Sequence, residues 1–295
     1  STDGKRIVYH AGADLFVYDI ANDSSQRVEV IYHSPRVQRN RKFVDATRYM
    51  DSLQLHPSGQ ALAMTTRGKL FSFYNHEGPV LQLGERDGVR YRLPEWFNDG
   101  RRLVVISDAE GEESLEIRVG NPTEAPLRLT GLDLGRIVSM KMSPTDDQVA
   151  VTNHRHELLL VDLSNLDKPQ PSDSTPAQRV TVVDRSAHRA IAGFNWSPDG
   201  RWIAYGFPNS MQTIEIRLYR LTAKAGDSNG KAGDGNSNNG AEKEGKAAFP
   251  NPIAITQPVL QDVQPAFDPE GRFLYFLSYR EFNPVYDGLQ FDIGF

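Results

Sequence analysis

The sequence contains no cysteine in 295 residues, which excludes disulfide bonds, thiol nucleophiles and thiolate metal ligands. No apolar run approaches the roughly 20 residues that a membrane-spanning helix needs, and no segment shows the apolar period and caps of an amphipathic helix. The net charge of −5 gives no bulk basic surface. Composition therefore predicts a chain with neither a nucleic-acid partner nor a membrane partner.

What the sequence has instead is a repeated turn. Its clearest copy is Trp196–Gly200, which is followed by the apolar strand Trp202–Gly206. Pro198 presets φ for the first turn position, Asp199 can bond its own backbone, and Gly200 tolerates a positive φ. Looser copies that precede apolar strands are Ser1–Gly4, His56–Gly59, Phe97–Gly100, Ser143–Asp146 and Asp268–Gly271.

The spacing of these turns defines the architecture. If the last residue of each turn is taken as its anchor, successive anchors are 55, 41, 46, 54 and 71 residues apart. A period of about 40 to 50 residues, filled by several short strands, is typical of propeller blades. The sequence therefore predicts an all-β fold, a β-propeller built from four-stranded antiparallel blades.

The repeats also divide the chain. Residues 1–33 are predicted to form the last partial blade of one propeller, and residues 49–295 the first five blades of a second. Residues 223–248 contain no large apolar side chain, so we expect a disordered insert there. The first unit lacks an inner strand and the last blade lacks an outer strand, so we expect an incomplete propeller, a segment of a longer protein.

Residues 34–48 break the pattern of the repeats. They are rich in basic side chains and are predicted to form a linker, although a binding patch for an anionic group or a partner surface is the alternative interpretation. The basic residues are Arg36, Arg39, Arg41, Lys42 and Arg48.

Two motif matches fall inside the insert. Gly226–Gly230 fits G-x-S-x-G with Ser228 in the nucleophile position, but neither the preceding strand nor the following helix of a nucleophile elbow is present. Asp234, Asn236 and Asn238 have the oxygen spacing of a calcium-binding loop, but the glycine and the final glutamate that such a loop requires are absent here. We interpret both matches as products of a Gly- and Asn-rich composition.

Other candidate groups are explained by structure. His154 and His156 share a face if they lie on a strand, yet no third metal ligand accompanies them. Glu110, Glu112 and Glu113 cluster in a predicted turn. Aromatic residues at strand positions are predicted to pack between blades rather than to stack on bases; they are Trp196, Trp202, Phe207, Phe267, Phe273 and Phe276. We therefore predict no catalytic, cofactor-binding or metal-binding residue and no cofactor in this chain.

The turn followed by an aromatic-aliphatic strand resembles the TolB-type propeller repeat. Longer stretches, Phe194–Pro208, Pro265–Arg280 and Asp287–Phe295, resemble the second propeller of the tricorn protease. Arg36–Asp51 resembles the connection that enters that propeller. The similarity covers the whole chain except residues 223–248.

The resemblance implies a seven-bladed propeller that follows a six-bladed one in a large serine protease. It implies a cytoplasmic homo-oligomer that degrades oligopeptides, with the catalytic residues in a C-terminal core outside this chain. This segment is then expected to scaffold the enzyme and to gate or filter peptide substrates. Two alternatives remain at this point: a TolB-like protein-binding propeller, and the propeller domain of a prolyl-oligopeptidase-type peptidase.

Overall fold

The structure is a computed structural model that describes residues 4–11, 14–31, 33, 35, 37, 43, 45–84, 88–120, 124–166, 179–221 and 252–280. The chain packs as two compact units, residues 1–45 and residues 46–295. The division falls within the predicted linker. Each unit is described by itself.

The first unit is a three-stranded antiparallel sheet, with strands β1 (Arg6–Ala11), β2 (Asp14–Asp19) and β3 (Ser24–Val28) in sequence order. The second unit begins with the short 3₁₀ helix η2 (Ala46–Tyr49) and continues in strands, and no α-helix occurs among the described residues.

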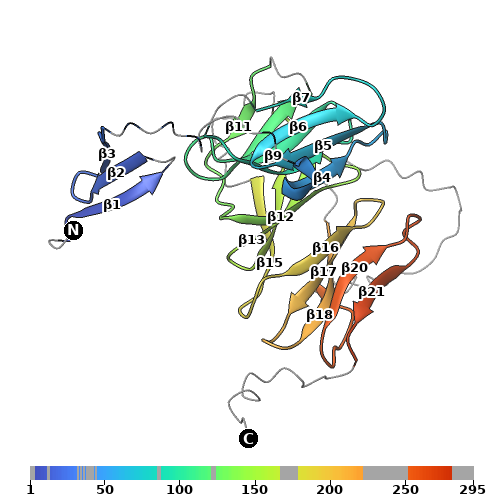
Figure 1. The fold of residues 1–295 in the computed structure, drawn as a ribbon. Helices are drawn as coiled ribbons and strands as arrows, with labels where there is room; N and C mark the ends of the chain where they lie inside the picture. Colours follow the sequence, from blue (N-terminus) through green and yellow to red (C-terminus); the bar gives the residue numbers. More distant parts are fainter. Residues whose placement is uncertain are drawn as a thin grey trace, which may run out of the picture. The chain divides into compact units, whose positions relative to one another are not determined.

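Four sheets of the second unit have four strands each, and every strand pairs antiparallel with its neighbour in sequence (Figure 1). The prediction of an all-β fold with four-stranded antiparallel blades is confirmed. The first of these sheets contains β4 (Met50–Leu55), β5 (Ala61–Thr66), β6 (Lys69–Tyr74) and β7 (Leu81–Gln82), and the second contains β8 (Tyr91–Trp96), β9 (Arg102–Ser107), β10 (Ser114–Val119) and β11 (Leu127–Leu129). The third contains β12 (Ile137–Met142), β13 (Gln148–Asn153), β14 (Glu157–Asp162) and β15 (Val180–Arg185). The fourth contains β16 (Ala192–Trp196), β17 (Trp202–Pro208), β18 (Ile214–Arg220) and β19 (Ile253–Ala254).

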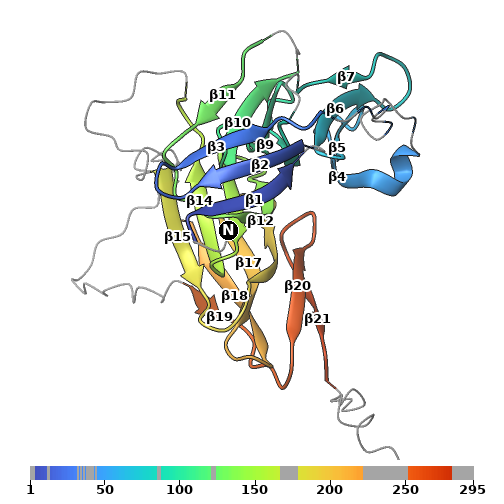
Figure 2. The ribbon, with the colours of Figure 1, turned by 60° about the vertical axis from the view of Figure 1, so that its left-hand side comes forward.

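A fifth sheet is described by two strands, β20 (Asp262–Phe267) and β21 (Leu274–Ser278). Its first strand lies beside β16, β17 and β18, and Figure 2 shows β20 and β21 next to the sheet that contains β17 and β18. A further strand expected at Leu289–Ile293 lies outside the described residues.

The repeated turn has the predicted geometry. In the copy at Trp196–Gly200, the Gly200 amide donates to the Ser197 carbonyl oxygen at 2.9 Å, and the Asp199 carboxylate accepts the Arg201 amide at 3.1 Å. Gly200 has a φ of +68°, a conformation that residues with a Cβ rarely adopt. The turn therefore forms because its composition supplies each of these requirements.

The turns also connect neighbouring sheets. The His56 Nε2 atom lies 2.7 Å from the Gly100 carbonyl oxygen, and the Asn98 amide donates to the Ser143 carbonyl oxygen at 3.0 Å. Each contact runs from one turn to the turn of the following sheet. The repeat thus joins blades to one another as well as the strands within a blade.

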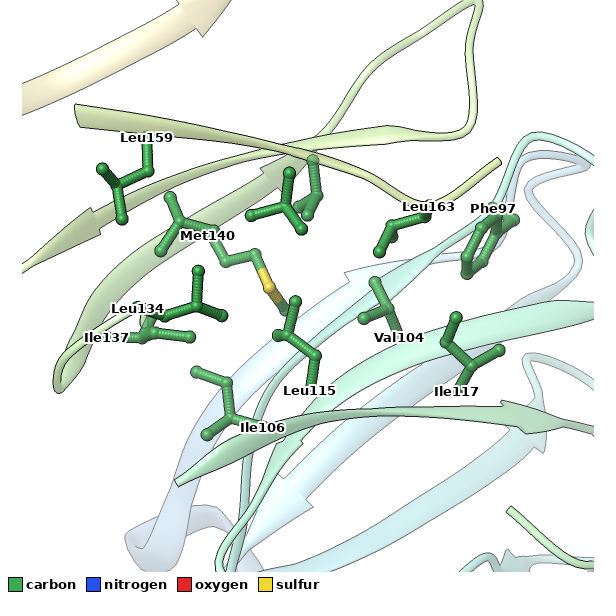
Figure 3. Packing of buried hydrophobic residues seen from close by; sticks show 13 residues of the cluster. Phe97, Val104, Ile106, Leu115, Ile117, Leu134, Ile137, Met140, Leu159 and Leu163 are labelled. Carbon is green, nitrogen blue, oxygen red and sulfur yellow. The ribbon is translucent and has the colours of Figure 1, made fainter. Parts of the chain in front are cut away.

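The core lies between the sheets. Figure 3 shows the largest cluster, in which Val104 and Leu115 from the β8–β11 sheet pack against Met140 and Leu159 from the β12–β15 sheet. A second cluster joins the β12–β15 and β16–β19 sheets through residues such as Leu158 and Trp196. Burial of these side chains is the main force that holds the blades side by side.

Candidate functional site

A cavity of about 340 Å³ is formed where the inner strands of the second unit come together. Its wall takes residues from the first strand of each of the five sheets, β4, β8, β12, β16 and β20, and from the turns that follow the last three of these strands. A site built from the inner strands of several blades can hold a ligand along the propeller axis.

Four polar side chains of the wall occupy one repeat position. Gln54, Glu95, Lys141 and Asn195 each lie five residues before the anchor of their turn, on β4, β8, β12 and β16. We call these four residues the collar. The fifth copy of this position is Ala266, so the polar character extends over four of the five sheets.

Each inner strand is irregular just before the collar. The pairing register shifts between Met50 and Ser52 in β4, and equivalent shifts interrupt β8, β12, β16 and β20. Leu93 and Gln264, within two of these irregularities, have positive φ. Such bulges bend a strand and redirect its side chains. They therefore set the direction of the collar residues, a feature that sequence alternation does not reveal.

Glu95 is the most strongly held member of the collar. Its Oε2 atom accepts hydrogen bonds from the Gln54 amide at 3.1 Å and from the Met142 main-chain N–H at 3.3 Å. The carboxyl thus bridges β4 and β12. Burial raises the pKa of Glu95 to about 7, although the Met142 hydrogen bond and the charge of Lys141 act in the opposite direction. The group therefore titrates near neutral pH.

Lys141 and Asn195 supply the unused donors of the collar. The Lys141 side chain is exposed to the cavity, and the structure records no ion pair within 4 Å for it among the described residues. Its nitrogen lies 5.8 Å from the centre of the Phe194 ring. Surrounding protein lowers the pKa of Lys141, while the charge of Glu95 acts to raise it.

The remaining wall is largely apolar. Trp196, Phe267 and Pro144 line the cavity beside the collar, together with Pro198 and Pro269. Trp196 is only 6% exposed, and its indole N–H donates to the Lys141 carbonyl oxygen at 3.1 Å. A cavity that combines apolar rings with a few polar groups suits an extended peptide, which presents both kinds of surface.

Several residues singled out from the sequence are not described by the structure. Ser228, Asp234, Asn236 and Asn238 fall outside the described residues, as do Arg36, Arg39, Arg41 and Lys42, whereas Arg48 lies in η2.

His154 and His156 lie in the turn between β13 and β14, so the condition for a shared strand face is not met. The Nδ1 atom of His154 accepts the Arg136 amide at 2.9 Å. Within the described ranges, three or more His, Asp or Glu side chains do not gather in a metal-binding arrangement.

Glu110, Glu112 and Glu113 lie in the loop between β9 and β10, where the expected turn is present. Glu110 pairs with Arg128 at 3.0 Å, and Glu113 pairs with Arg92 at 2.9 Å. Glu110 and Glu113 are therefore engaged in ion pairs with arginines of this sheet, and none of the three carboxylates lines the cavity.

The prediction that the aromatic residues at strand positions pack between blades agrees with the burial of some of them. Trp196 and Phe207 are buried, and Trp202, Phe267 and Phe276 are partly buried. Phe273, however, is 58% exposed, which corrects the prediction that it packs between blades. It precedes β21, which also has Tyr275 and Leu277 exposed, because no other described sheet covers this side of β21.

The collar was not predicted from sequence. A signal was available, because its members share one offset from the repeated turn. Gln, Glu, Lys and Asn are all polar but differ in charge and length, so the pattern is visible only when the blades are aligned on their anchors.

The fold and the cavity define a β-propeller segment whose inner strands line a cavity. Comparison with known protein families identifies the type of propeller. The sequence model described as "Tricorn protease second beta propeller domain" matches residues 50–229. The chain belongs to this family.

Individual relatives agree with that assignment. The chain is 29% identical over its whole length to a tricorn-like protease C-terminal subunit from Sulfurisphaera tokodaii, covering 29% of that protein. It is 28% identical over its whole length to a tricorn protease homolog from Saccharolobus solfataricus, covering 23% of that protein. The chain thus spans less than a third of the length of these relatives.

A solved structure supports the fold. The crystal structure of the tricorn protease matches 97% of this chain with a TM-score of 0.61 and 22% sequence identity, over 24% of its own length. In the described part of the present structure, no helix is long and apolar enough to cross a bilayer.

Proposed function

We propose that this chain forms part of the wall of a peptide channel in a tricorn-type serine protease. The cavity lined by all five inner strands, with a polar collar beside apolar rings, is the observation that carries the proposal. Membership of the tricorn second-propeller family supports a role in a protease. The chain scaffolds the enzyme and filters the oligopeptides that reach its catalytic core.

The proposed division of labour rests on the family resemblance. No residue of this chain is assigned a catalytic role, because the catalytic serine and its partners belong to the C-terminal core implied by the family resemblance. We further propose that the parent protein is cytoplasmic and homo-oligomeric, as that resemblance implies.

A pair of assays with the 295-residue chain tests the proposal. Fluorescence anisotropy of labelled, unstructured octapeptides is expected to show saturable binding, while mass spectrometry after long incubation is expected to show no cleavage. Replacement of the collar residue Asn195 by a larger side chain, Asn195→Trp, is expected to weaken binding severalfold. Peptide cleavage by this chain, or a lack of binding, contradicts the proposal.

A further inference from the structure

We propose that Lys141 and Asn195 form a binding site for a peptide carboxylate, and that Glu95 weakens this site when it is ionised. This inference rests on the proposed peptide channel and names the chemical group that the collar recognises. The inference gives the channel a preference for negatively charged groups of a peptide, in addition to the selection by size that its shape imposes.

The first argument concerns hydrogen-bond donors. Lys141 and Asn195 lie at the same repeat position of β12 and β16, and both side chains line the cavity. Among the described residues, neither side chain has a recorded hydrogen bond or ion pair. Their donors are therefore available to a ligand. An ammonium and an amide N–H together suit a carboxylate, since a charge-assisted hydrogen bond is among the stronger polar contacts.

The second argument concerns the spacing of the two strands. The hydrogen bond from the Trp196 indole to the Lys141 carbonyl oxygen links β16 to β12 directly beside both donors. Trp196 is itself buried in the cluster that joins the two sheets. The two donors are thus mounted on strands whose separation is fixed before a ligand binds, which lowers the entropic cost of binding.

The third argument concerns the surrounding charges. Lys141 of β12 is the cation among the residues that line the cavity, and Glu95 of β8 and Asp268 after β20 are the carboxylates. Asp268 accepts the Phe273 amide at 2.6 Å and lies 3.9 Å from Arg272. His56, in the turn after β4, contacts Ser58 and the Gly100 carbonyl oxygen. On the neighbouring strand β9, the residue paired with Glu95 is the uncharged Val104. Gln54 and Asn195 are neutral.

Glu95 is the carboxyl of the cavity wall to which we assign the change in charge near neutral pH. Its pKa is raised to about 7, so the carboxyl is largely neutral at pH 6 and largely ionised at pH 8. In the neutral form it leaves the Lys141 charge available to an anion. In the ionised form it competes with the ligand for that charge and repels a second carboxylate.

The test uses N-terminally labelled octapeptides of one alanine- and glycine-rich sequence, measured by fluorescence anisotropy with the intact 295-residue chain. One peptide ends in a free carboxylate, a second in an amide, and a third in an amide with a glutamate near its end. At pH 6 we expect the free acid to bind about tenfold more tightly than the amide, the difference that one charged hydrogen bond provides.

Three substitutions in the collar and one control substitution outside it connect this preference to the collar. Lys141→Met is expected to abolish the preference for the acid, Lys141→Arg to retain it, and Lys5→Met, in the first unit, to leave it unchanged. At pH 8 the wild-type preference is expected to fall severalfold, whereas Glu95→Gln is expected to hold it constant between pH 6 and pH 8. Retention by Lys141→Arg separates a charge requirement from general damage to the fold.

The outcomes separate this inference from the proposed function. If acid and amide peptides bind equally well, the carboxylate site is wrong while the peptide channel stands. If neither peptide binds, both are wrong. A preference that survives in Lys141→Met also contradicts the site. Tight binding of the glutamate-containing amide supports recognition of any carboxylate, and its absence supports recognition of the C-terminus alone.

Discussion

The Trp196 indole nitrogen donates a hydrogen bond to the Lys141 main-chain oxygen at 3.1 Å, although the two residues are 55 positions apart and belong to different sheets. Trp196 ends the inner strand β16, and Lys141 lies near the end of the inner strand β12. One bond therefore joins two blades at the point where both reach the cavity. We expect contacts of this kind to contribute both to stability and to the shape of the site.

Trp196→Phe is expected to lower the free energy of unfolding by about 1 to 3 kcal/mol, because it removes this hydrogen bond and part of a buried ring. Trp202→Phe serves as the matched control, since Trp202 is only partly buried, and it is expected to cost less than about 1 kcal/mol. Urea denaturation monitored by circular dichroism measures both. Equal costs for the two substitutions contradict the role given to Trp196.

Gly200→Ala is expected to be more destabilising than Gly59→Ala, although both glycines have positive φ in equivalent turns. A Cβ at Gly200 collides with the Thr145 side chain of the preceding turn, whereas a Cβ at Gly59 has no neighbour within 4 Å. Both substitutions carry a backbone cost of about 1 kcal/mol, so the excess at Gly200 measures the contact between turns. The double variant Gly200→Ala, Thr145→Ala is expected to recover part of that excess in the same denaturation experiment. No recovery in the double variant counts against the contact.

Glu95→Gln is expected to stabilise the protein above pH 7 and to change little near pH 4. A carboxyl whose pKa is raised on folding favours the folded state in its protonated form. Its stabilising contribution is therefore lost as the pH rises from the unfolded value of about 4.5 through the folded value of about 7. The gain from glutamine is expected to be on the order of 1 to 3 kcal/mol. Denaturation midpoints at both pH values measure it, with the exposed Glu77→Gln as control.

Glu157→Gln is expected to show the opposite pH dependence. Burial alone raises the pKa of Glu157, but hydrogen bonds from Asn153 and Arg185 and the charges of Arg155 and Arg185 lower it overall. The stability that these partners give is present above about pH 4.5 and is lost as the pH falls through the folded pKa. At pH 7 the substitution is expected to cost about 1 to 3 kcal/mol.

The difference between wild type and Glu157→Gln is expected to shrink as the pH is lowered toward 3. Acid titration followed by far-ultraviolet circular dichroism measures this change, and the exposed Glu112→Gln provides the control. A difference that is constant over this range shows that the effect is due to packing rather than charge.

Much of the fold could be predicted because its signals are local. Turn composition and apolar alternation place β9, β12, β14 and β16 with their observed bounds. For the third strand the sequence predicts Arg27–Tyr32, because the apolar residues Val28, Val30 and Ile31 fall there, whereas β3 spans Ser24–Val28. Asp19 accepts the amides of Ala21 and Asn22 in the preceding turn, and this tight turn brings the polar residues Ser24–Gln26 into register opposite β2.

The candidate site was harder to predict because its signals are not local. Gln54 and Glu95 are 41 residues apart and meet only when two blades pack together. The raised pKa of Glu95 depends on burial by its neighbours. The bulges that direct the collar residues depend on register between strands, which residue types alone do not specify. The unit that could be predicted is the blade, and the site arises between blades.

The central claim, that the collar faces a peptide-binding channel, is tested most directly by blocking it. Because the natural sequence contains no cysteine, Asn195→Cys carries a single reactive thiol on the cavity wall, and Val182→Cys carries one on the exposed outer strand β15. Each variant is treated with a bulky maleimide, and octapeptide affinity is measured before and after. Our account predicts that labelling abolishes binding only in Asn195→Cys, and unchanged affinity after complete labelling of that variant contradicts it.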